Sequence, residues 1–453
     1  MKTAVLIMIA SAAFVCAQGG RSYGPDHIWW DAGHGGVLPW DEDYDNPEGM
    51  ATIVNATGAI RTDGHPFFEA LGVNGRACVT CHQPSNAMGL SAVTVRERWS
   101  QTDGKDPIFA AIDGSNCPDL PQKEMASHSL LIQKGLFRIS LPWPPKVAPE
   151  FKIEVVSDPT GCNTSPAYGL KSPNPSVSVY RRPRMAANLK YVTSGMRQVS
   201  LMADGREPSL ETQAISAATI HEQVTAPLTE EQLREIVHFE MQIFAAQGAD
   251  IRGGMLNEKN GPTTLGPQNL STGMASSLGG GFGETFDIWK TPKDAGDFQQ
   301  NFRASVARGS EVFSKRQFRV RDAGTPGMAT CATCHGSEKA RLVDIGTTNL
   351  PLAKAAADLP LFKITCDSTV APHPFLGRVI YTQDPGRALI SGKCADVGSI
   401  MIEQFRGLAA RAPYFSNGSS MTLREVVEFY NLRFDIHYTD QEKQDLVNFL
   451  KVL

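Results

Sequence analysis

The sequence has little excess charge of either sign and, after its first residues, no long apolar run. Its 43 Lys and Arg against 47 Asp and Glu give a formal charge of -4, so it lacks the basic surface that nucleic acid or an anionic membrane attracts. No later stretch approaches the 18 or so uncharged apolar residues of a transmembrane helix. We therefore expect a mature protein with no membrane insertion and no nucleic acid partner.

The first 17 residues are the exception to this pattern. MKTAVLIMIASAAFVCA has a lysine, an apolar run and small or apolar residues before Gln18, as in a cleaved secretory signal peptide. A membrane anchor is the alternative, but the run is short for a bilayer. We expect signal-peptide cleavage and a periplasmic or secreted protein.

The length of the chain predicts two domains, because 453 residues exceed the size at which single hydrophobic cores stop growing. We expect a signal peptide at 1–17, an N-terminal extension at 18–65, a first domain at 66–250, a glycine-rich connection at 251–298 and a second domain at 299–453.

Local patterns predict a mainly α fold with small β insertions. Capping boxes that begin at Thr229, Thr422 and Thr439 predict helices, the first of them extending to residue 247. Helix starts are also expected in HPFFEALG and in NFRASVARGSEVF, each upstream of a cysteine motif. Strand-like runs are short, the best being FKIEVV and SVSVY.

Two of the cysteine clusters share the pattern C-x-x-C-H. The first consists of Cys78, Cys81 and His82, and the second of Cys331, Cys334 and His335. The residue frequencies of the chain predict about 0.004 copies of this pattern by chance. Two copies therefore indicate a shared chemistry.

Covalently bound haem c explains the spacing better than zinc or a redox dithiol. Two thiols three residues apart reach the vinyl groups of one porphyrin, and the adjacent histidine ligates iron. Zinc sites combine nearby pairs, whereas these pairs lie about 250 residues apart. A thioredoxin-like site needs a βαβ pattern, which is not visible. We expect two haem c groups with His82 and His335 as iron ligands.

Four cysteines remain besides Cys16 and the two motifs. An even number in an oxidising compartment favours disulfides. Pairing Cys117 with Cys162 and Cys366 with Cys394 keeps each bridge inside one half of the chain. Free buried thiols are the alternative.

The chain resembles the bacterial di-haem cytochrome c peroxidase and MauG family. The resemblance covers most of residues 66–453 and rests on the two motifs, on ADGREPSLETQA at 203–214 and on FRGLAARAPYFSNGSSMTLREVVEFYN at 405–431. It implies two cytochrome-c-like haem domains. The first haem would react with peroxide, and the second would pass electrons from a small cytochrome c or cupredoxin. Some members of the family are dimers, so a homodimer is one state the resemblance implies.

The resemblance places the sixth ligand of the second haem at Tyr430. The peroxidases of the family have methionine at this position, and the maturation enzyme MauG has tyrosine. One face of the predicted helix carries Leu423, Val426, Val427, Tyr430 and Phe434, and such a face packs against something. A core tyrosine is the alternative, and Met401 and Met421 are rival ligands.

Around the first haem the sequence departs from the family. Peroxidases of the family have a removable distal histidine in the loop after the first motif. The stretch QPSNAMGLSAVTVRERW after His82 contains no histidine. We therefore expect the iron of the first haem to be open to peroxide or dioxygen. The family transfers protons with a glutamine and a glutamate ten residues later. Gln213 matches the first, but Gln223 stands at the second, and an amide cannot carry a proton. Glu222 or His221 takes the role, or both lie on a solvated helix end.

Three further positions also differ from the family. Ala203 matches the tryptophan between the haems, so electrons need another route. Arg182 and Arg411 match side-chain positions of the interdomain calcium, and two cations there argue against the ion. Both arginines could instead pair with haem propionates.

Three functions follow from these features. The first is a peroxidase-type oxidoreductase that reduces hydrogen peroxide with electrons relayed through the second haem. The second is a non-enzymatic di-haem electron carrier, and the third is a dioxygen-using oxidase or oxygenase of an organic substrate. The missing distal histidine argues against the carrier, so we favour the peroxidase.

Overall fold

The computed structural model describes residues 29–194, 199–273, 285–292, 294, 296–321, 327–336, 341–344, 346–348 and 355–453. The predicted signal peptide and its cleavage site lie outside the described residues, as do the start of the N-terminal extension and part of the glycine-rich connection.

The prediction of a mainly α fold built from cytochrome-c-like domains is wrong. Helices make up 34% and strands 20% of the chain, and the strands form several small sheets. Most of these strands are short, and many pair with partners far away in the sequence, which no local periodicity reveals. The strand Gly49–Asn55, for example, pairs with Ile243–Asp250.

The described helices are α1 (Cys78–Cys81), α2 (Ala92–Thr102), α3 (Ala111–Gly114), α4 (Ser129–Lys134), α5 (Leu189–Thr193), α6 (Leu210–Ala217), α7 (Glu230–Gln242), α8 (Pro267–Ser271), α10 (Phe298–Lys315), α11 (Cys331–His335), α12 (Ala388–Ser391), α13 (Leu423–Arg433) and α14 (Asp440–Lys451). A π-helical turn, Ala218–Glu222, continues α6.

The described strands are β1 (Val37–Leu38), β2 (Asp41–Asn46), β3 (Gly49–Asn55), β4 (Ile60–Arg61), β5 (Phe137–Pro142), β6 (Phe151–Ser157), β7 (Ser176–Arg181), β8 (Ile243–Asp250), β9 (Gly254–Met255), β10 (Phe318–Val320), β11 (Gly327–Ala329), β12 (Arg341–Val343), β13 (Leu361–Cys366), β14 (Val379–Thr382) and β15 (Ser399–Met401). The largest sheet has the order β2-β3-β8-β9, and a three-stranded sheet has the order β14-β13-β6.

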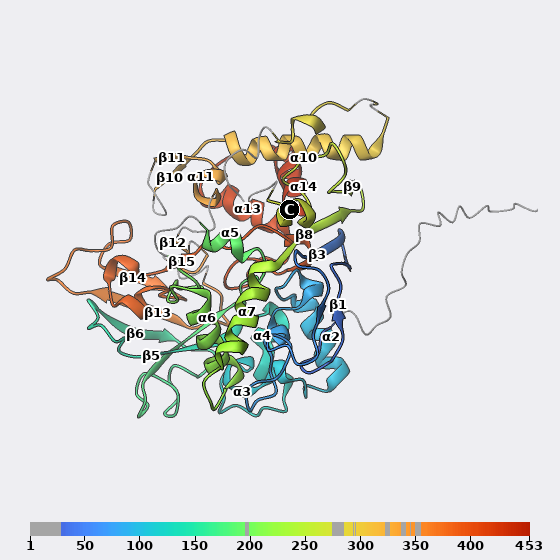
Figure 1. Ribbon diagram of the computed structural model, residues 1–453. Coiled ribbons are helices and arrows are strands. Elements are labelled where there is room, and N and C mark those ends of the chain that lie inside the picture. Colours follow the sequence, from blue (N-terminus) through green and yellow to red (C-terminus); the bar gives the residue numbers. More distant parts are fainter. Residues whose placement is uncertain are drawn as a thin grey trace, which may run out of the picture.

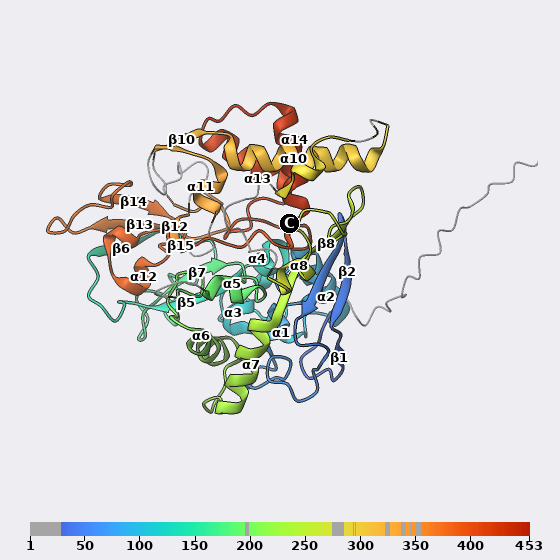
Figure 2. The same ribbon diagram turned by 45° about the horizontal axis from the view of Figure 1, so that its top comes forward.

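The helices lie in two groups, one above the other in Figure 1. Helices α10, α11, α13 and α14 occupy the upper part, and α3, α4, α6 and α7 occupy the lower part. The strands β6, β13 and β14 project from one side in both views (Figures 1 and 2). Strand β6 comes from the first predicted domain and β13 from the second, so this sheet joins the two parts of the chain.

Each cysteine motif packs against its own hydrophobic core. Cys331 contacts the cluster formed by α10, α13 and α14, and Cys78 contacts the cluster around Phe67, Phe68 and Phe239. At the crossing of α10 and α14, a Cβ at Gly309 would collide with the Asp445 carbonyl oxygen. Glycine therefore lets the two backbones approach closely.

The predicted capping boxes are confirmed at Thr229, Thr422 and Thr439. The helix after Thr229 ends at Gln242, five residues earlier than predicted, because Ile243–Asp250 is extended and fully buried in the β2-β3-β8-β9 sheet. HPFFEALG forms turns rather than a helix. The strands expected in FKIEVV and SVSVY are confirmed as β6 and β7.

Both predicted disulfides are present, Cys117–Cys162 and Cys366–Cys394. Cys366 ends β13, and its bridge belongs to the core beneath the β14-β13-β6 sheet. The motif cysteines are not disulfide-bonded, so the division of the cysteines expected from the sequence holds.

Candidate functional site

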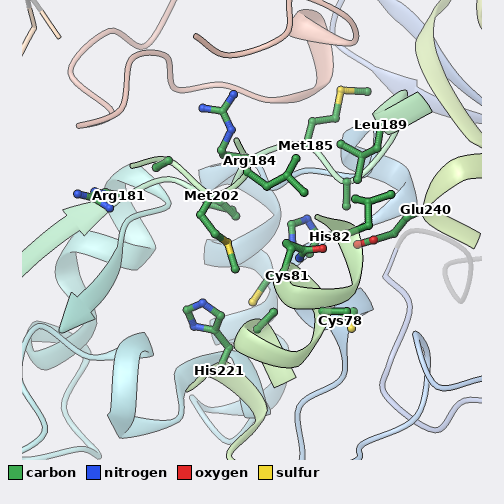
Figure 3. A pocket seen from close by; sticks show the side chains of 18 of the residues that line it. Cys78, Cys81, His82, Arg181, Arg184, Met185, Leu189, Met202, His221 and Glu240 are labelled. Atoms are coloured by element: carbon green, nitrogen blue, oxygen red, sulfur yellow. The ribbon is translucent and has the colours of Figure 1, made fainter. Parts of the chain in front are cut away.

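The first motif opens onto a cavity of about 1420 Å³, measured out to its open mouth. All of the residues predicted for the first site line it, namely Cys78, Cys81, His82, Gln213, His221 and Glu222. In Figure 3 the side chains of Cys81 and His221 project into this space.

His82 is held with one ring nitrogen against the backbone. Its Nδ1 lies 3.3 Å from the carbonyl oxygen of Met88, and assigning the proton to Nδ1 makes this a hydrogen bond. Burial lowers the pKa of His82 to about 4, so the imidazole is neutral near pH 7. A neutral ring anchored through Nδ1 leaves Nε2 as a ligand atom.

The π-helical turn places His221 and Glu222 beside the motif. The loop before the motif is hydrogen-bonded to this turn, because the Asn74 side-chain amide donates to the His221 carbonyl oxygen at 2.8 Å. A Cβ at Gly72 would collide with the Glu222 carbonyl oxygen, so glycine allows the two backbones to touch. Gln223 ends the turn with a φ of +58°. π-turns often occur at functional sites, where they alter the direction of side chains.

His221 is hydrogen-bonded to a buried pair of charged groups, Asp113 and Arg76. Its Nδ1 lies 2.6 Å from Asp113 Oδ2, and Asp113 Oδ1 accepts a hydrogen bond from Arg76. Burial alone would raise the pKa of Asp113, but Arg76 and His221 hold it below its usual value. The carboxylate therefore stays ionised and fixes the orientation of the imidazole, whose side chain is 29% exposed.

Glu222 lies against the first cysteine rather than in solvent. The Cys78 thiol donates to Glu222 Oε1 at 3.2 Å, and Oε2 is buried with no hydrogen-bond partner of good geometry in the described structure. Burial raises the pKa of Glu222 to about 7, against smaller opposing effects of Cys78, the Leu71 backbone and Arg76. The expectation that these residues form a solvated helix end is not met for Glu222, which is buried.

Glu240 is a further buried carboxyl group in this cavity, besides Asp113 and Glu222, and was not expected from the sequence. It is 3% exposed on α7. With the Gln213 amide oriented so that its nitrogen faces Glu240, that nitrogen lies 3.2 and 3.3 Å from the two carboxyl oxygens. Burial raises the pKa of Glu240 to about 8, and Glu211 adds to the effect. The sequence did contain one signal for its burial, because Glu240 is a charged residue on the apolar face of α7, beside Ile236 and Phe239.

The second motif opens onto a cavity of about 1790 Å³, also measured to its mouth. Cys331, Cys334 and His335 line it. The predicted helix face lines it as well, with Leu423, Val426, Val427, Tyr430 and Phe434. The structure thus brings the motif and this face of α13 together.

Tyr430 faces the histidine of the second motif directly. Its hydroxyl oxygen lies 3.4 Å from His335 Nε2. Burial lowers the pKa of His335 to about 4 and raises the pKa of Tyr430 above its usual value. Of the rival residues, Met401 is buried and lines both cavities, whereas Met421 is 46% exposed and does not line this cavity.

A wall rich in arginine separates the two cavities. Residues 181–184, Ala203 and Met401 line both, and the Met401 amide donates to the Ala203 carbonyl oxygen at 2.8 Å. Arg182 donates to the carbonyl oxygens of Leu90, Lys134 and Arg411. Burial and the Arg411 charge lower the pKa of Arg182 to about 9.

The protein side chains alone do not assemble a metal cage. Within the part of the chain that the structure describes, no group of three or more His, Cys, Asp and Glu side chains has the arrangement needed to hold a metal ion. Nor does any described helix have the length and apolar character needed to cross a membrane.

Comparison with protein-family profiles finds no match, and neither does comparison with curated proteins. Among solved structures, the chain has a distant similarity to a MauG-like protein associated with microbial copper homeostasis, with 16% sequence identity and a TM-score of 0.30. The match covers 61% of this chain and 76% of that one. At this distance, nothing known of that protein carries over to this chain.

Proposed function

We propose that this protein is an exported di-haem c oxidoreductase of the peroxidase type, which reduces hydrogen peroxide with electrons from a small cytochrome c or cupredoxin. The observation that carries the proposal is the pairing of each C-x-x-C-H motif with its own cavity. In both cases the two cysteines and the histidine line the same space.

The residues of both cavities fit a covalently attached haem. Each offers two thiols and one imidazole, and burial raises the pKa of the thiols, as for Cys81, where it reaches about 12. His82 and His335 would ligate iron, and the thiols would hold the porphyrin as thioethers. When bound, haem iron supplies the redox chemistry and the site for peroxide. The two disulfides support export into an oxidising compartment.

The two cavities differ in the groups that face their histidines. Tyr430 lies opposite His335, which supports a tyrosine as the second ligand there, and an anionic oxygen ligand favours the ferric state. The first cavity instead carries His221, oriented by a buried carboxylate. This difference supports peroxide chemistry in the first cavity and electron transfer in the second.

In this proposal His221 takes a proton from the incoming peroxide. Its Nδ1 is engaged by Asp113, which leaves Nε2 as the basic atom. Asp113 holds the ring in place and stabilises the imidazolium once the proton arrives, while Arg76 keeps Asp113 ionised. A positioned acid–base group of this kind contributes about 10²–10⁴-fold to a rate.

Electrons have to cross the shared wall to reach the first cavity. Ala203 lies in this wall at the position where the family has a tryptophan. The backbone amide of Met401 donates a hydrogen bond to the Ala203 carbonyl oxygen. Both side chains line both cavities. We propose the Ala203–Met401 segment as the route, with the neighbouring arginines available to neutralise carboxylates of the bound groups.

The first experiment counts the haems. The mass of the protein purified from cells that attach haem c should exceed the polypeptide mass by two haems. Replacing both cysteines of one motif, Cys78 and Cys81 or Cys331 and Cys334, should remove one haem and leave the other. A wild-type protein without covalent haem would refute the proposal.

The second experiment measures peroxide reduction with a reduced small cytochrome c or a cupredoxin as donor. His221→Gln should lose at least 100-fold in rate while keeping both haems. The matched control is His437→Gln, because His437 also lies near an aspartate, Asp435, at 3.0 Å, but is 80% exposed. Equal rates in both variants would exclude His221 from the reaction.

The other two functions appear as different outcomes of this assay. A protein that ignores peroxide but consumes dioxygen with an organic reductant would be an oxidase or oxygenase. A protein that exchanges electrons but reacts with neither oxidant would be a carrier. In a carrier, Met185 and Met202, which also line the first cavity, would be the candidates for the sixth ligand of the first haem iron.

A further inference from the structure

The buried Glu240 and the half-buried Gln213 form a pair in the first cavity, away from His221. In the view of Figure 3, Glu240 approaches from the side of Leu189, whereas His221 lies toward Met202. Both residues line the cavity of the first motif. The cavity therefore contains a partly exposed imidazole and a fully enclosed carboxyl group on different elements.

The surroundings of Glu240 give its carboxyl group one polar partner. Ile236 and Phe239, which precede Glu240 in α7, are buried as well. The Gln213 side chain reaches the Glu240 carboxyl group from α6. No ion pair joins Glu240 to a described arginine or lysine, and Glu211 contributes a further negative charge. A carboxylate buried without a cation is costly, so such a group takes up a proton.

The amide of Gln213 can serve either protonation state. With its nitrogen toward Glu240 it donates to an ionised carboxylate, at 3.2 and 3.3 Å. With its oxygen in that place it accepts from a protonated carboxyl group. The pair therefore remains hydrogen-bonded whether or not Glu240 carries the proton, which is what a group that releases and regains a proton requires.

We propose that Glu240, held by Gln213, is the general acid that donates a proton to the departing oxygen of the peroxide. This inference rests on the proposed peroxidase function and adds a catalytic group to it. It also explains why Gln223, at the position where the family has glutamate, need not be acidic. Glu222 is turned toward Cys78 instead.

The proton and electron balance of the reaction is complete. His221 takes a proton from one peroxide oxygen, and Glu240 gives its proton to the other, which leaves as water when the O–O bond breaks. The remaining oxygen becomes the second water with two electrons from the protein donor and two protons, one from His221 and one from solvent. A second solvent proton restores Glu240. In sum, one hydrogen peroxide, two protons and two electrons give two water molecules.

The test compares the intact holoprotein with Glu240→Gln, which keeps the size and the hydrogen bond to Gln213 but cannot titrate. The first readout is the infrared carbonyl band of protonated carboxyl groups, recorded from pH 6 to pH 9. The wild type should show a component that disappears as the pH rises through about 8 and that Glu240→Gln lacks. Glu222→Gln should retain this component.

Neighbouring charges provide an internal check on the assignment. The titratable groups that interact with Glu240 are Glu211 on α6 and Cys78 on α1. Glu211 is exposed, so Glu211→Gln should leave the fold intact and shift the Glu240 component to lower pH. A component that persists in Glu240→Gln, or no component at any pH, overturns the proposal.

The second readout is the rate at which one equivalent of hydrogen peroxide reacts with the protein. Measured at pH 6, Glu240→Gln should slow this rate about 10²–10⁴-fold, with both haems still attached. Glu211→Gln should react like the wild type at this pH, where Glu240 keeps its proton in both proteins. If the wild type reacts with peroxide and Glu240→Gln reacts equally fast, the role of Glu240 is overturned but the proposed peroxidase function is not. A wild type that ignores peroxide overturns the proposed function, and the infrared band still reports whether Glu240 holds a proton.

Discussion

Replacing Asp113 with Asn should cost far more stability than the same change at a surface ion pair. Asp113 and Arg76 are both almost fully buried, with side-chain exposures of 4% and 1%. Asn removes the charge that compensates the guanidinium, and breaking a buried pair in this way costs about 3–5 kcal/mol. We expect this loss in the free energy of unfolding, measured as a lower urea midpoint at pH 7.

The matched control is Asp358→Asn. Asp358 pairs with Lys134 at 2.6 Å, but its side chain is 41% exposed, and surface pairs contribute about 0–1 kcal/mol. Because the substitution is identical, the difference between the two variants isolates burial. Equal shifts of the urea midpoint would refute the reasoning about the Arg76–Asp113–His221 chain.

The same pair predicts a dependence on pH. The folded-state pKa of Asp113 lies below its usual value of 3.8, so its contribution to stability is present above pH 3.8 and is lost as the pH falls through the folded-state pKa. The wild type should therefore lose stability relative to Asp113→Asn below pH 3.8. A constant difference between the two proteins across this range would contradict the assignment.

Three further predictions concern other parts of the molecule. Tyr430→Phe should change the electron paramagnetic resonance signal of one haem and leave the other unaltered, and an unchanged spectrum would exclude Tyr430 as a ligand. Glu222→Gln should keep most of the peroxide turnover, because Glu222 faces Cys78, so a loss as large as that of Glu240→Gln would reassign the acid. Replacing Cys366 and Cys394 with serine opens a loop with a sequence separation of 28; about 3–4 kcal/mol should be lost on unfolding by urea, and no loss would mean that this bridge is not structural.

Features that depend on neighbours in the sequence could be predicted. The capping boxes at Thr229, Thr422 and Thr439 act within one turn, and each begins a helix as expected. The two disulfides followed from the number and grouping of the cysteines. The face of α13 that carries Tyr430 followed from helical periodicity and lines the second cavity.

Features that depend on distant partners could not be predicted. Strands β3 and β8 lie almost 200 residues apart, and neither has a usable pattern without the other, so the fold looked more helical than it is. Asp113 is 108 residues from His221, and nothing in its own segment indicates their contact. Glu240 resembled any glutamate on an amphipathic helix until the packing of α6 against α7 enclosed it.

The most direct test of the account is the low-temperature electron paramagnetic resonance spectrum of the fully oxidised protein, before and after one equivalent of hydrogen peroxide. We expect a high-spin ferric signal from the His82 site beside a low-spin signal from the His335 site, with the high-spin signal lost on addition of peroxide. Two low-spin signals that peroxide leaves unchanged would contradict an open, reactive site in the first cavity.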